Sequence, residues 1–415
     1  MNNNSSGGGG GGGRAPREIH VEVEEEDYIE EEDDDLSFAA MESGSKKAAV
    51  AARVRGKGCG GNYYLGTMPE WSNLVKAFGP LDFLDYTLRG CGQVYFMNNP
   101  ISGLILLIGL VIEKPLLAVG CLIAQIGVDI GARRAGLTGY NGILVGAAIV
   151  TFMKDEWDIP TLIIIVPYAC ISVLIWMFLG NIMVGTWNIP PFTFAFNFTA
   201  TIFFIAYFPL AMFTPSLPTA ASPGFDWDTQ AVFEAVFKGV GQVMFAGSTA
   251  SGVIMTLALA ACSPIAAMMA VLGSSIGVLV GFAVGADAAG IEAGLWGYNP
   301  VLGAIAVGGM FYYPTVKTLV MTVINAGFCS LLFGFFKVAL APWGIPAFTF
   351  PFCFATMVVV GIGKSLPDFE PIPLPEVTVP EEHLCKRWQR SRGLYNILNG
   401  PLPFLNSVEN IGTIN

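Results

Sequence analysis

The sequence predicts an all-α polytopic membrane protein, because apolar residues are abundant, charges are scarce and the uncharged stretches are long. Hydrophobic residues occupy 53% of the 415 positions and charged residues 13%, about half of the roughly 25% that is usual in soluble domains. Residues 159–225, 239–286 and 338–363 contain no charged side chain. One helical crossing needs about 20 apolar residues, so these stretches provide several crossings and exclude secreted, fibrous and ordinary cytosolic proteins.

Residues 1–60 are expected to form a disordered, acidic cytoplasmic tail. Eleven of the fourteen residues in 22–35 are acidic, and residues 7–13 are all glycine. Such a segment cannot bury enough apolar surface to offset the entropy lost on ordering its chain. The net charge of −11 is therefore partly a property of this tail rather than of the membrane body.

The membrane body is internally duplicated, with a first repeat expected at 61–225 and a second at 226–365. Three blocks recur in the same order, at offsets of 149, 158 and 156 residues. They are Gly-Gln-Val-x-Phe at 92–96 and 241–245, Ala-Gly-Leu-x-Gly-Tyr-Asn at 135–141 and 293–299, and Ile-Pro-x-Phe-Thr-Phe-x-Phe at 189–196 and 345–352. Chance is a poor explanation for three ordered blocks at nearly one spacing.

The charges that flank the body predict its orientation. Basic residues cluster before it and after it, at Arg53, Arg55, Lys57, Lys386, Arg387, Arg390 and Arg392. The positive-inside rule then places both termini, including the segment 366–415, in the cytoplasm, so the number of crossings is even. The length of each repeat suits about five transmembrane helices plus a re-entrant pore half-helix. An odd number of crossings per repeat makes the two repeats inverted about an axis in the membrane plane.

Each repeat carries one glutamine and one threonine in apolar surroundings, Gln93 and Thr193 in the first, Gln242 and Thr349 in the second. A buried amide without a partner costs about 1–3 kcal/mol, so its recurrence suggests a use. Two interpretations remain open for the glutamines: a polar group at a pore mouth, or a hydrogen bond between helices. The threonines either face the permeation path or bond a carbonyl one turn back in their own helix.

A tyrosine and a leucine four residues apart follow the Gly-Tyr-Asn block in each repeat, as Tyr140 with Leu144 and Tyr298 with Leu302. Side chains at this spacing share one helix face. Such a face either walls a narrow slot with a flat aromatic and an aliphatic side chain, or packs in an ordinary core. The sequence leaves both possibilities open.

The residue inventory argues against an enzyme and against a charged permeant. The two histidines, His20 and His383, are expected outside the hydrophobic body, so no imidazole metal site, triad or proton relay is expected within it. The eight cysteines are isolated in the sequence and are interpreted as small buried apolar residues rather than disulfides or a zinc site. Most acids and bases flank the apolar runs, which favours a neutral permeant.

Several blocks resemble the urea transporter family of membrane channels over residues 70–385. The resemblance rests on residues 88–103, 139–146, 297–299 and 308–312, and on both Phe-Thr-x-x-Phe blocks. It implies passive, channel-like urea transport in the plasma membrane by a homotrimer, with one narrow, uncharged and aromatic-walled pore per protomer. Urea and lipid are the implied partners, without cofactor, metal or nucleic acid. The pore positions that the resemblance implies are Gln93, Val94, Phe96, Tyr140, Leu144, Thr193, Gln242, Val243, Phe245, Tyr298, Leu302 and Thr349.

One departure from the family pattern concerns the second turn. Family members usually have Asn-Pro after both Gln-Val-x-Phe blocks, whereas here the first reads Asn99-Pro100 and residues 247–250 read Gly-Ser-Thr-Ala. The second re-entrant turn is therefore expected to differ in shape.

Other transport classes fit the sequence less well. An ammonia channel would want histidines in the pore, and an aquaporin would want Asn-Pro-Ala in both halves, whereas Asn-Pro continues here as Ile101 and Val301. An ion-coupled secondary transporter of a small neutral solute is the alternative, because such proteins also use inverted repeats.

Overall fold

The computed structural model describes residues 64–125, 136–154, 158–207, 229–367 and 369–399, and the expected acidic tail lies outside these ranges. These residues form helices joined by turns and loops, apart from one isolated bridge between Tyr312 and Pro371. The predicted all-helical fold is confirmed for this part of the chain. A short helix, α2 (Pro69–Val75), precedes the body.

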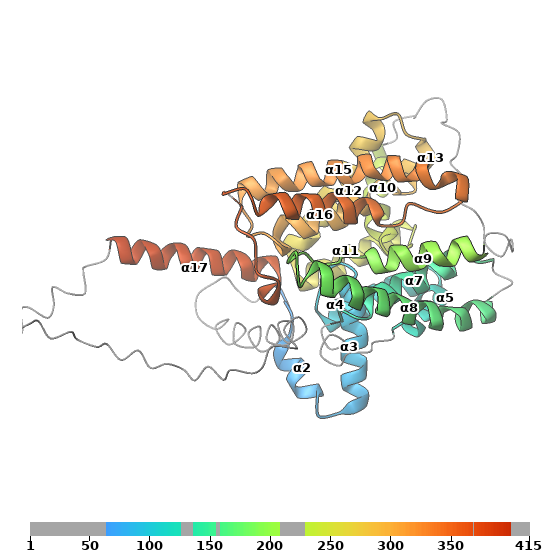
Figure 1. Ribbon diagram of the computed structural model, residues 1–415, viewed down its shortest axis with the longest axis horizontal. Helices are drawn as coiled ribbons and strands as arrows, with labels where there is room; N and C mark the ends of the chain where they lie inside the picture. The colour runs from blue at the N-terminus through green and yellow to red at the C-terminus, as the bar shows by residue number, and fades with distance from the viewer. Residues whose placement is uncertain (1–63, 126–135, 155–157, 208–228, 368, 400–415) are drawn as a thin grey trace, which may run out of the picture. The chain divides into compact units, whose positions relative to one another are not determined.

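Two series of helices form the body, and both are visible in Figure 1. The first consists of α3 (Gly79–Gln93), α4 (Pro100–Glu113), α5 (Pro115–Ile123), α7 (Tyr140–Phe152), α8 (Asp158–Met183) and α9 (Phe194–Tyr207). The second consists of α10 (Thr229–Gln242), α11 (Thr249–Cys262), α12 (Pro264–Ala283), α13 (Ala288–Glu292), α14 (Tyr298–Ile305), η4 (Ala306–Met310), α15 (Val316–Leu340), η5 (Ala341–Trp343) and α16 (Phe350–Gly363). The chain continues through η6 (Leu374–Glu376) into α17 (Pro380–Asn399).

Corresponding helices of the two series have similar lengths. Helices α4 and α11 have 14 residues each, as do α9 and α16, while α8 has 26 and α15 has 25. In Figure 1, α8 and α9 lie on one side of the body and α15 and α16 on the other. Helices α9 and α16 contact each other, so the two Phe-Thr blocks are brought together.

The turns after α3 and α10 share their central backbone hydrogen bonds but differ just before the next helix, where Asn99 N donates to Met97 O and Ser248 N donates to Glu113 Oε2. Phe96 N donates to Gln93 O at 3.0 Å, and Phe245 N donates to Gln242 O at 3.1 Å. The side chain of Asn99 caps α4 by accepting from Ser102 N, and that of Ser248 caps α11 by accepting from Ser251 N. Serine and asparagine are both strong helix N-caps, so a different residue builds an equivalent cap, and the expected difference is confined to the residues just before it.

Two glycines explain how the segment before α7 and α14 packs on α3 and α10. Gly136 has φ of 73° and Gly294 has φ of 75°, a region that residues with a Cβ atom rarely adopt. A Cβ on Gly136 would also meet the backbone of Arg89. Both features require glycine, which accounts for its recurrence in the Ala-Gly-Leu-x-Gly-Tyr-Asn block.

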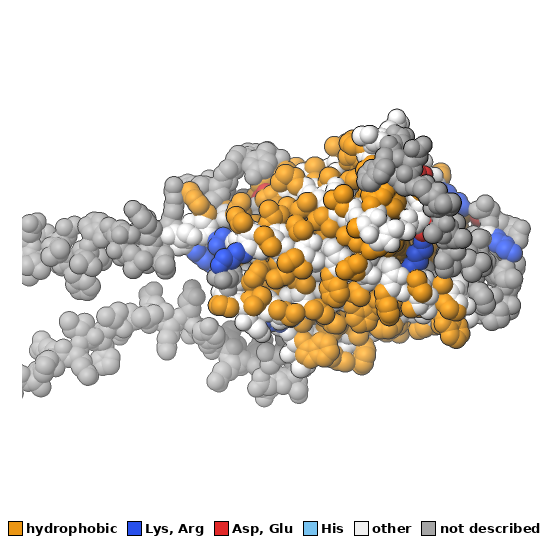
Figure 2. Space-filling view, turned by 90° about the horizontal axis from the view of Figure 1, so that it is seen from above, with side chains coloured by type: hydrophobic (Ala, Val, Ile, Leu, Met, Phe, Trp, Pro, Cys, Tyr) orange, Lys and Arg blue, Asp and Glu red, His pale blue; other side chains and the backbone are white. Residues whose placement is uncertain are grey.

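Helix lengths and surface chemistry fit a multi-pass membrane protein. Among the described residues, α8, α12 and α15 with its extension to Trp343 are long and apolar enough to cross a bilayer. Helix α7 has 13 residues, about 20 Å at 1.5 Å per residue, which is shorter than the roughly 30 Å hydrocarbon layer. Figure 2 shows hydrophobic side chains over most of one face, with Lys and Arg gathered near its two ends.

The short helices α7 and α14 form the centre of the body. Residues 140–150 of α7 are buried, and so is every residue of α14. By contrast, α8 and α15 expose large apolar side chains such as Ile159, Leu174 and Val338. The outer helices thus present the lipid-facing surface, while the short helices pack inside.

The structure corrects two expectations for the C-terminal segment. His383 was expected outside the hydrophobic body, but it is fully buried against Gly309 of η4. Helix α17 is polar overall, and the sequence gives no sign that its first turn packs on the body. Cys385 was expected to be a free apolar residue, but it is disulfide-bonded. Six other cysteines in the described ranges are free, and five of them are buried.

Candidate functional site

Eight phenylalanines form two clusters, which we call the first and second Phe quartets. The first quartet comprises Phe96, Phe192, Phe311 and Phe352, and the second comprises Phe245, Phe348, Phe152 and Phe196. Each ring meets two others edge to face, at centroid distances of 5.3–6.1 Å in the first quartet and 5.4–6.4 Å in the second. Both quartets combine residues of the two repeats, so they lie where the repeats meet.

Four of these phenylalanines have left-handed backbone conformations. The φ angles are 65° for Phe96, 46° for Phe192, 62° for Phe245 and 44° for Phe348. This conformation costs an L-residue about 1–2 kcal/mol, and it persists only where the surrounding structure enforces it. Strain of this kind clusters at functional sites, and here it falls on matched residues of the two quartets.

A π-helical turn explains why Phe152 and Phe311, which are equivalent in the two quartets, are not aligned by the repeated sequence blocks. Phe152 ends the regular helix α7, whereas Phe311 follows the π-helical turn η4, in which Phe311 N donates to Ala306 O at 3.0 Å. Phe152 comes 12 residues after Tyr140, and Phe311 comes 13 residues after Tyr298. A π turn inserts one residue into a helix, so the two residues are equivalent although their offset differs by one.

The two predicted threonines meet at the junction of α9 and α16. Thr193 Oγ1 and Thr349 Oγ1 are 2.6 Å apart, and both side chains are buried. Thr349 Oγ1 also donates to Asn197 Oδ1 at 3.0 Å, and Thr193 Oγ1 lies 3.1 Å from Cys353 Sγ. The hydroxyls therefore bond to each other and across the repeats, not to a carbonyl one turn back.

The tyrosines and asparagines of the Gly-Tyr-Asn blocks hold the starts of α9 and α16. Tyr298 OH donates to Phe348 O at 2.7 Å, and Tyr140 OH donates to Phe192 O. Asn141 Oδ1 accepts from Phe196 N, and Asn299 Oδ1 accepts from Phe352 N, both at 3.0 Å. The asparagines satisfy N–H groups that helix starts leave without partners, and the tyrosines bond carbonyl oxygens just before the same helices. The asparagines belong to a recurring block, but nothing in its pattern predicts this role.

The remaining predicted residues divide into two groups by burial. Gln93, Gln242, Phe96 and Phe245 are partly exposed, whereas Val94, Val243, Leu144 and Leu302 are almost fully buried. Tyr140 and Tyr298 are 8% and 9% exposed. Gln242 Nε2 donates to Ala293 O at 3.0 Å, which is the packing contact that the sequence left open for this residue.

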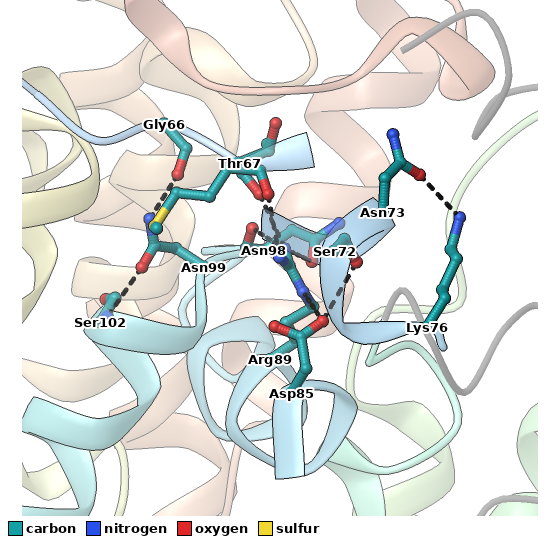
Figure 3. Close-up of polar contacts among 11 residues, drawn as sticks. Gly66, Thr67, Ser72, Asn73, Lys76, Asp85, Arg89, Asn98, Asn99 and Ser102 are labelled. Carbon is teal, nitrogen blue, oxygen red and sulfur yellow. Dashed lines mark hydrogen bonds and ion pairs between the residues drawn. The ribbon is translucent and has the colours of Figure 1, made fainter. Parts of the chain in front are cut away.

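A buried ion pair, which the sequence analysis overlooked, supports the turn that carries Gln93 and Phe96 (Figure 3). Arg89 Nε bonds Asp85 Oδ2 at 2.8 Å, and both side chains are 3% exposed. The Arg89 guanidinium also donates to Thr67 O and Asn98 O, both at 2.8 Å, and to Asn98 Oδ1 at 3.0 Å. Arginine suits this place because its planar fork donates in several fixed directions.

The duplication places a second ion pair at the equivalent position of α10. Glu234 and Lys238 lie 149 residues after Asp85 and Arg89. Lys238 Nζ lies 3.3 Å from Glu234 Oε2, with side chains 23% and 31% exposed. Each repeat thus has an i, i+4 ion pair one turn before its glutamine, buried in one repeat and partly exposed in the other. Matching the acids and bases between the repeats would have revealed the pair.

Comparison with known proteins agrees with the resemblance inferred from the sequence. A family model described as Urea transporter matches residues 84–364. Urea transporter 1 of Ovis aries is 32% identical over 358 residues, covering 82% of this chain and 92% of that protein. Urea transporter 1 of Rattus norvegicus is 31% identical over 353 residues, covering 79% and 91%. The matched region contains both Phe quartets and the threonine pair, and the family is a transport family rather than an enzyme family. The chain belongs to the urea transporter family.

Proposed function

We propose that the protein carries urea passively across the plasma membrane, through a narrow path that passes both Phe quartets and the threonine pair. The observation that carries this proposal is the 2.6 Å contact between Thr193 and Thr349. Thr193 lies in the chain between Phe192 of the first quartet and Phe196 of the second. Thr349 lies between Phe348 of the second quartet and Phe352 of the first. A polar centre flanked by aromatic clusters therefore arises at the repeat interface.

The chemistry of this arrangement suits a flat neutral amide. Urea is planar and has four N–H donors and one carbonyl acceptor. Aromatic faces accommodate a plane, while threonine hydroxyls both donate and accept hydrogen bonds. A hydroxyl pair thus replaces part of the hydration of urea in the middle of the path. Binding at such a site must be weak enough for the molecule to leave.

The electrostatics of the centre disfavour cations. Helix α9 begins at Phe194 and α16 begins at Phe350, so the N-terminal ends of both helices lie at the threonine pair. A helix N-terminus carries a partial positive charge. Helices α7, α9, α14 and α16 contain no Asp, Glu, Lys or Arg. A cation would lose its water there without gaining a counter-charge, which costs far more than desolvating a neutral molecule.

Passive transport predicts that urea flux is independent of ion gradients. We expect equal initial rates of urea uptake in proteoliposomes with and without a sodium or proton gradient, measured by stopped-flow light scattering. Protein-free liposomes give the background rate. Uphill accumulation of urea driven by either gradient would instead establish the ion-coupled secondary transporter, and a rate equal to the background would reject urea transport.

The remaining parts of the proposal come from the family resemblance and the duplication. We infer two inverted repeats around one pore per protomer, a homotrimer in lipid, and both termini in the cytoplasm. The matching helix order of the two series supports the repeats. The twelve predicted pore positions include the threonine pair, Phe96 and Phe245. Phe96 belongs to the first quartet and Phe245 to the second, and each lies three residues after the glutamine of its repeat. Gln93 and Gln242 are proposed to bind urea at the two mouths.

A further inference from the structure

The C-terminal segment 369–383, which we call the clamp segment, binds the turn that carries Phe311. Ile372 N donates to Phe311 O at 2.9 Å, and Tyr313 N donates to Glu370 O at 3.3 Å. Two residues before Phe311, Gly309 O is 2.7 Å from His383 Nδ1. The backbone on both sides of a quartet phenylalanine is therefore hydrogen-bonded to a segment that lies beyond the second repeat in the sequence.

The hydrogen bonds of His383 define its tautomer and its role. Thr378 N donates to His383 Nε2 at 2.9 Å, so Nε2 is an acceptor and carries no proton. Nδ1 therefore carries the proton of the neutral ring and donates it to Gly309 O. Burial lowers the pKa of His383 to about 4, which keeps the ring in this neutral form near pH 7. The imidazole thus bridges Thr378 of the clamp segment and the π-helical turn.

A buried carboxylate anchors the same end of α17 to α12. Glu381 Oε2 accepts from Ser263 Oγ at 2.6 Å, and Glu381 Oε1 accepts from Ile265 N at 2.8 Å. These bonds satisfy groups in the first turn of α12, where a carboxylate is favoured. Glu381 and His383 both lie in the first turn of α17 (Pro380–Asn399). The bonds from Glu381 to α12 therefore hold His383 in position beside Gly309.

Phe311 needs such support more than its counterpart Phe152. Phe152 is the last residue of a regular helix, and the following residue continues the pattern, with Met153 N donating to Ile149 O at 2.9 Å. Phe311 follows a π-helical turn, and the irregular backbone of such a turn restrains the direction of the ring less than a regular helix does. The contacts from outside the repeat compensate for this irregularity.

We propose that His383 is a positioning residue for transport specificity: through Gly309 it fixes Phe311 in the first Phe quartet and so sets which amides pass. This inference rests on the proposed urea function. Phe311 contacts Phe96 and Phe192 at centroid distances of 5.6 and 5.8 Å. Release of Phe311 would leave one side of the quartet loose, and a looser aromatic slot discriminates less against substituted ureas.

The test compares three substitutions of His383 in the full chain. His383→Asn places an amide donor near the position of Nδ1, while His383→Gln places its amide near Nε2, farther from Gly309 O, and His383→Leu has no hydrogen-bonding group. We expect the ratio of N-methylurea flux to urea flux in proteoliposomes to rise about threefold or more in the Gln and Leu variants. The Asn variant should keep the wild-type ratio. Ser391→Ala, which removes an exposed hydroxyl that donates to Arg387 O within α17 at 3.0 Å, is the control and should change nothing.

A measurement independent of transport separates this inference from the proposed function. 4-Fluorophenylalanine at position 311 reports the surroundings of that ring through its ¹⁹F NMR signal. We expect the signal of wild type and His383→Asn to coincide, and that of His383→Gln to shift or broaden. Coinciding signals and equal flux ratios in wild type and His383→Gln would overturn the inference. Wild type without urea flux would overturn the proposed function, while the ¹⁹F signals would still decide whether His383 positions Phe311.

Discussion

Replacing both central hydroxyls, in Thr193→Val plus Thr349→Val, should reduce urea flux by about 10- to 100-fold. Each valine keeps the shape of threonine but removes one hydrogen-bonding group, and an unmet polar group costs about 1–3 kcal/mol. A barrier higher by about 1.4 kcal/mol slows passage tenfold. The two hydroxyls now bond each other at 2.6 Å, so the protein itself loses little when both are removed together.

Stopped-flow urea flux in proteoliposomes measures this effect, with the amount of reconstituted protein as the reference. Each single substitution leaves one hydroxyl, so each should fall between wild type and the double variant. Thr256 is a suitable control, because its hydroxyl bonds Gly252 O in its own helix α11 at 2.8 Å. Thr256→Val should retain wild-type flux. Undiminished flux in a folded double variant would remove the threonines from the path.

Arg89→Met should be the most destabilising of the single substitutions considered, at about 3–5 kcal/mol, because it leaves the buried carboxylate of Asp85 without its counter-charge. It also removes the donors to Thr67 O and Asn98 O. The equivalent substitution in the second repeat, Lys238→Met, breaks a partly exposed pair and should cost about 1 kcal/mol. The duplication therefore supplies a matched control within one molecule.

Thermal unfolding in detergent, followed by fluorescence-detected size exclusion, compares the two variants. We expect Arg89→Met to melt well below wild type or to fail to accumulate, and Lys238→Met to melt close to wild type. Adding Asp85→Asn to Arg89→Met removes the unpaired charge, so the double variant should recover part of the loss. Equal melting temperatures for the two methionine variants would show that burial of the first ion pair contributes nothing.

The order of helices and the central threonine pair could be predicted because the duplication repeats them in the sequence. Two blocks at one offset imply two equivalent places, and Thr193 and Thr349 do meet across the repeats. The quartets were harder to find. Phe152 lies 12 residues after Tyr140, whereas Phe311 lies 13 residues after Tyr298, because η4 is π-helical. A local change from α-helix to π-helix cannot be recognised from residue composition.

Tertiary packing explains the other differences. Ser248 replaces an asparagine without changing the cap of the following helix, because several residue types supply the same hydrogen bond. His383 was misplaced because α17 is polar overall and only its first turn is buried. The Asp85–Arg89 pair was overlooked because it lies on α3, which precedes the long uncharged runs that predict the membrane body.

Reversible closure of the path tests the central claim most directly. The two hydroxyl oxygens are 2.6 Å apart, so cysteines at both positions should form a disulfide, whose sulfurs lie about 2.05 Å apart. The protein would carry Thr193→Cys, Thr349→Cys and Cys353→Ala, because Cys353 Sγ lies 3.1 Å from Thr193 Oγ1. Cys353→Ala alone is the control. We predict that oxidation lowers urea flux from the rate of the reduced triple variant to the protein-free rate and that reduction restores the former. Full flux in the cross-linked protein would contradict a urea path between the two threonines.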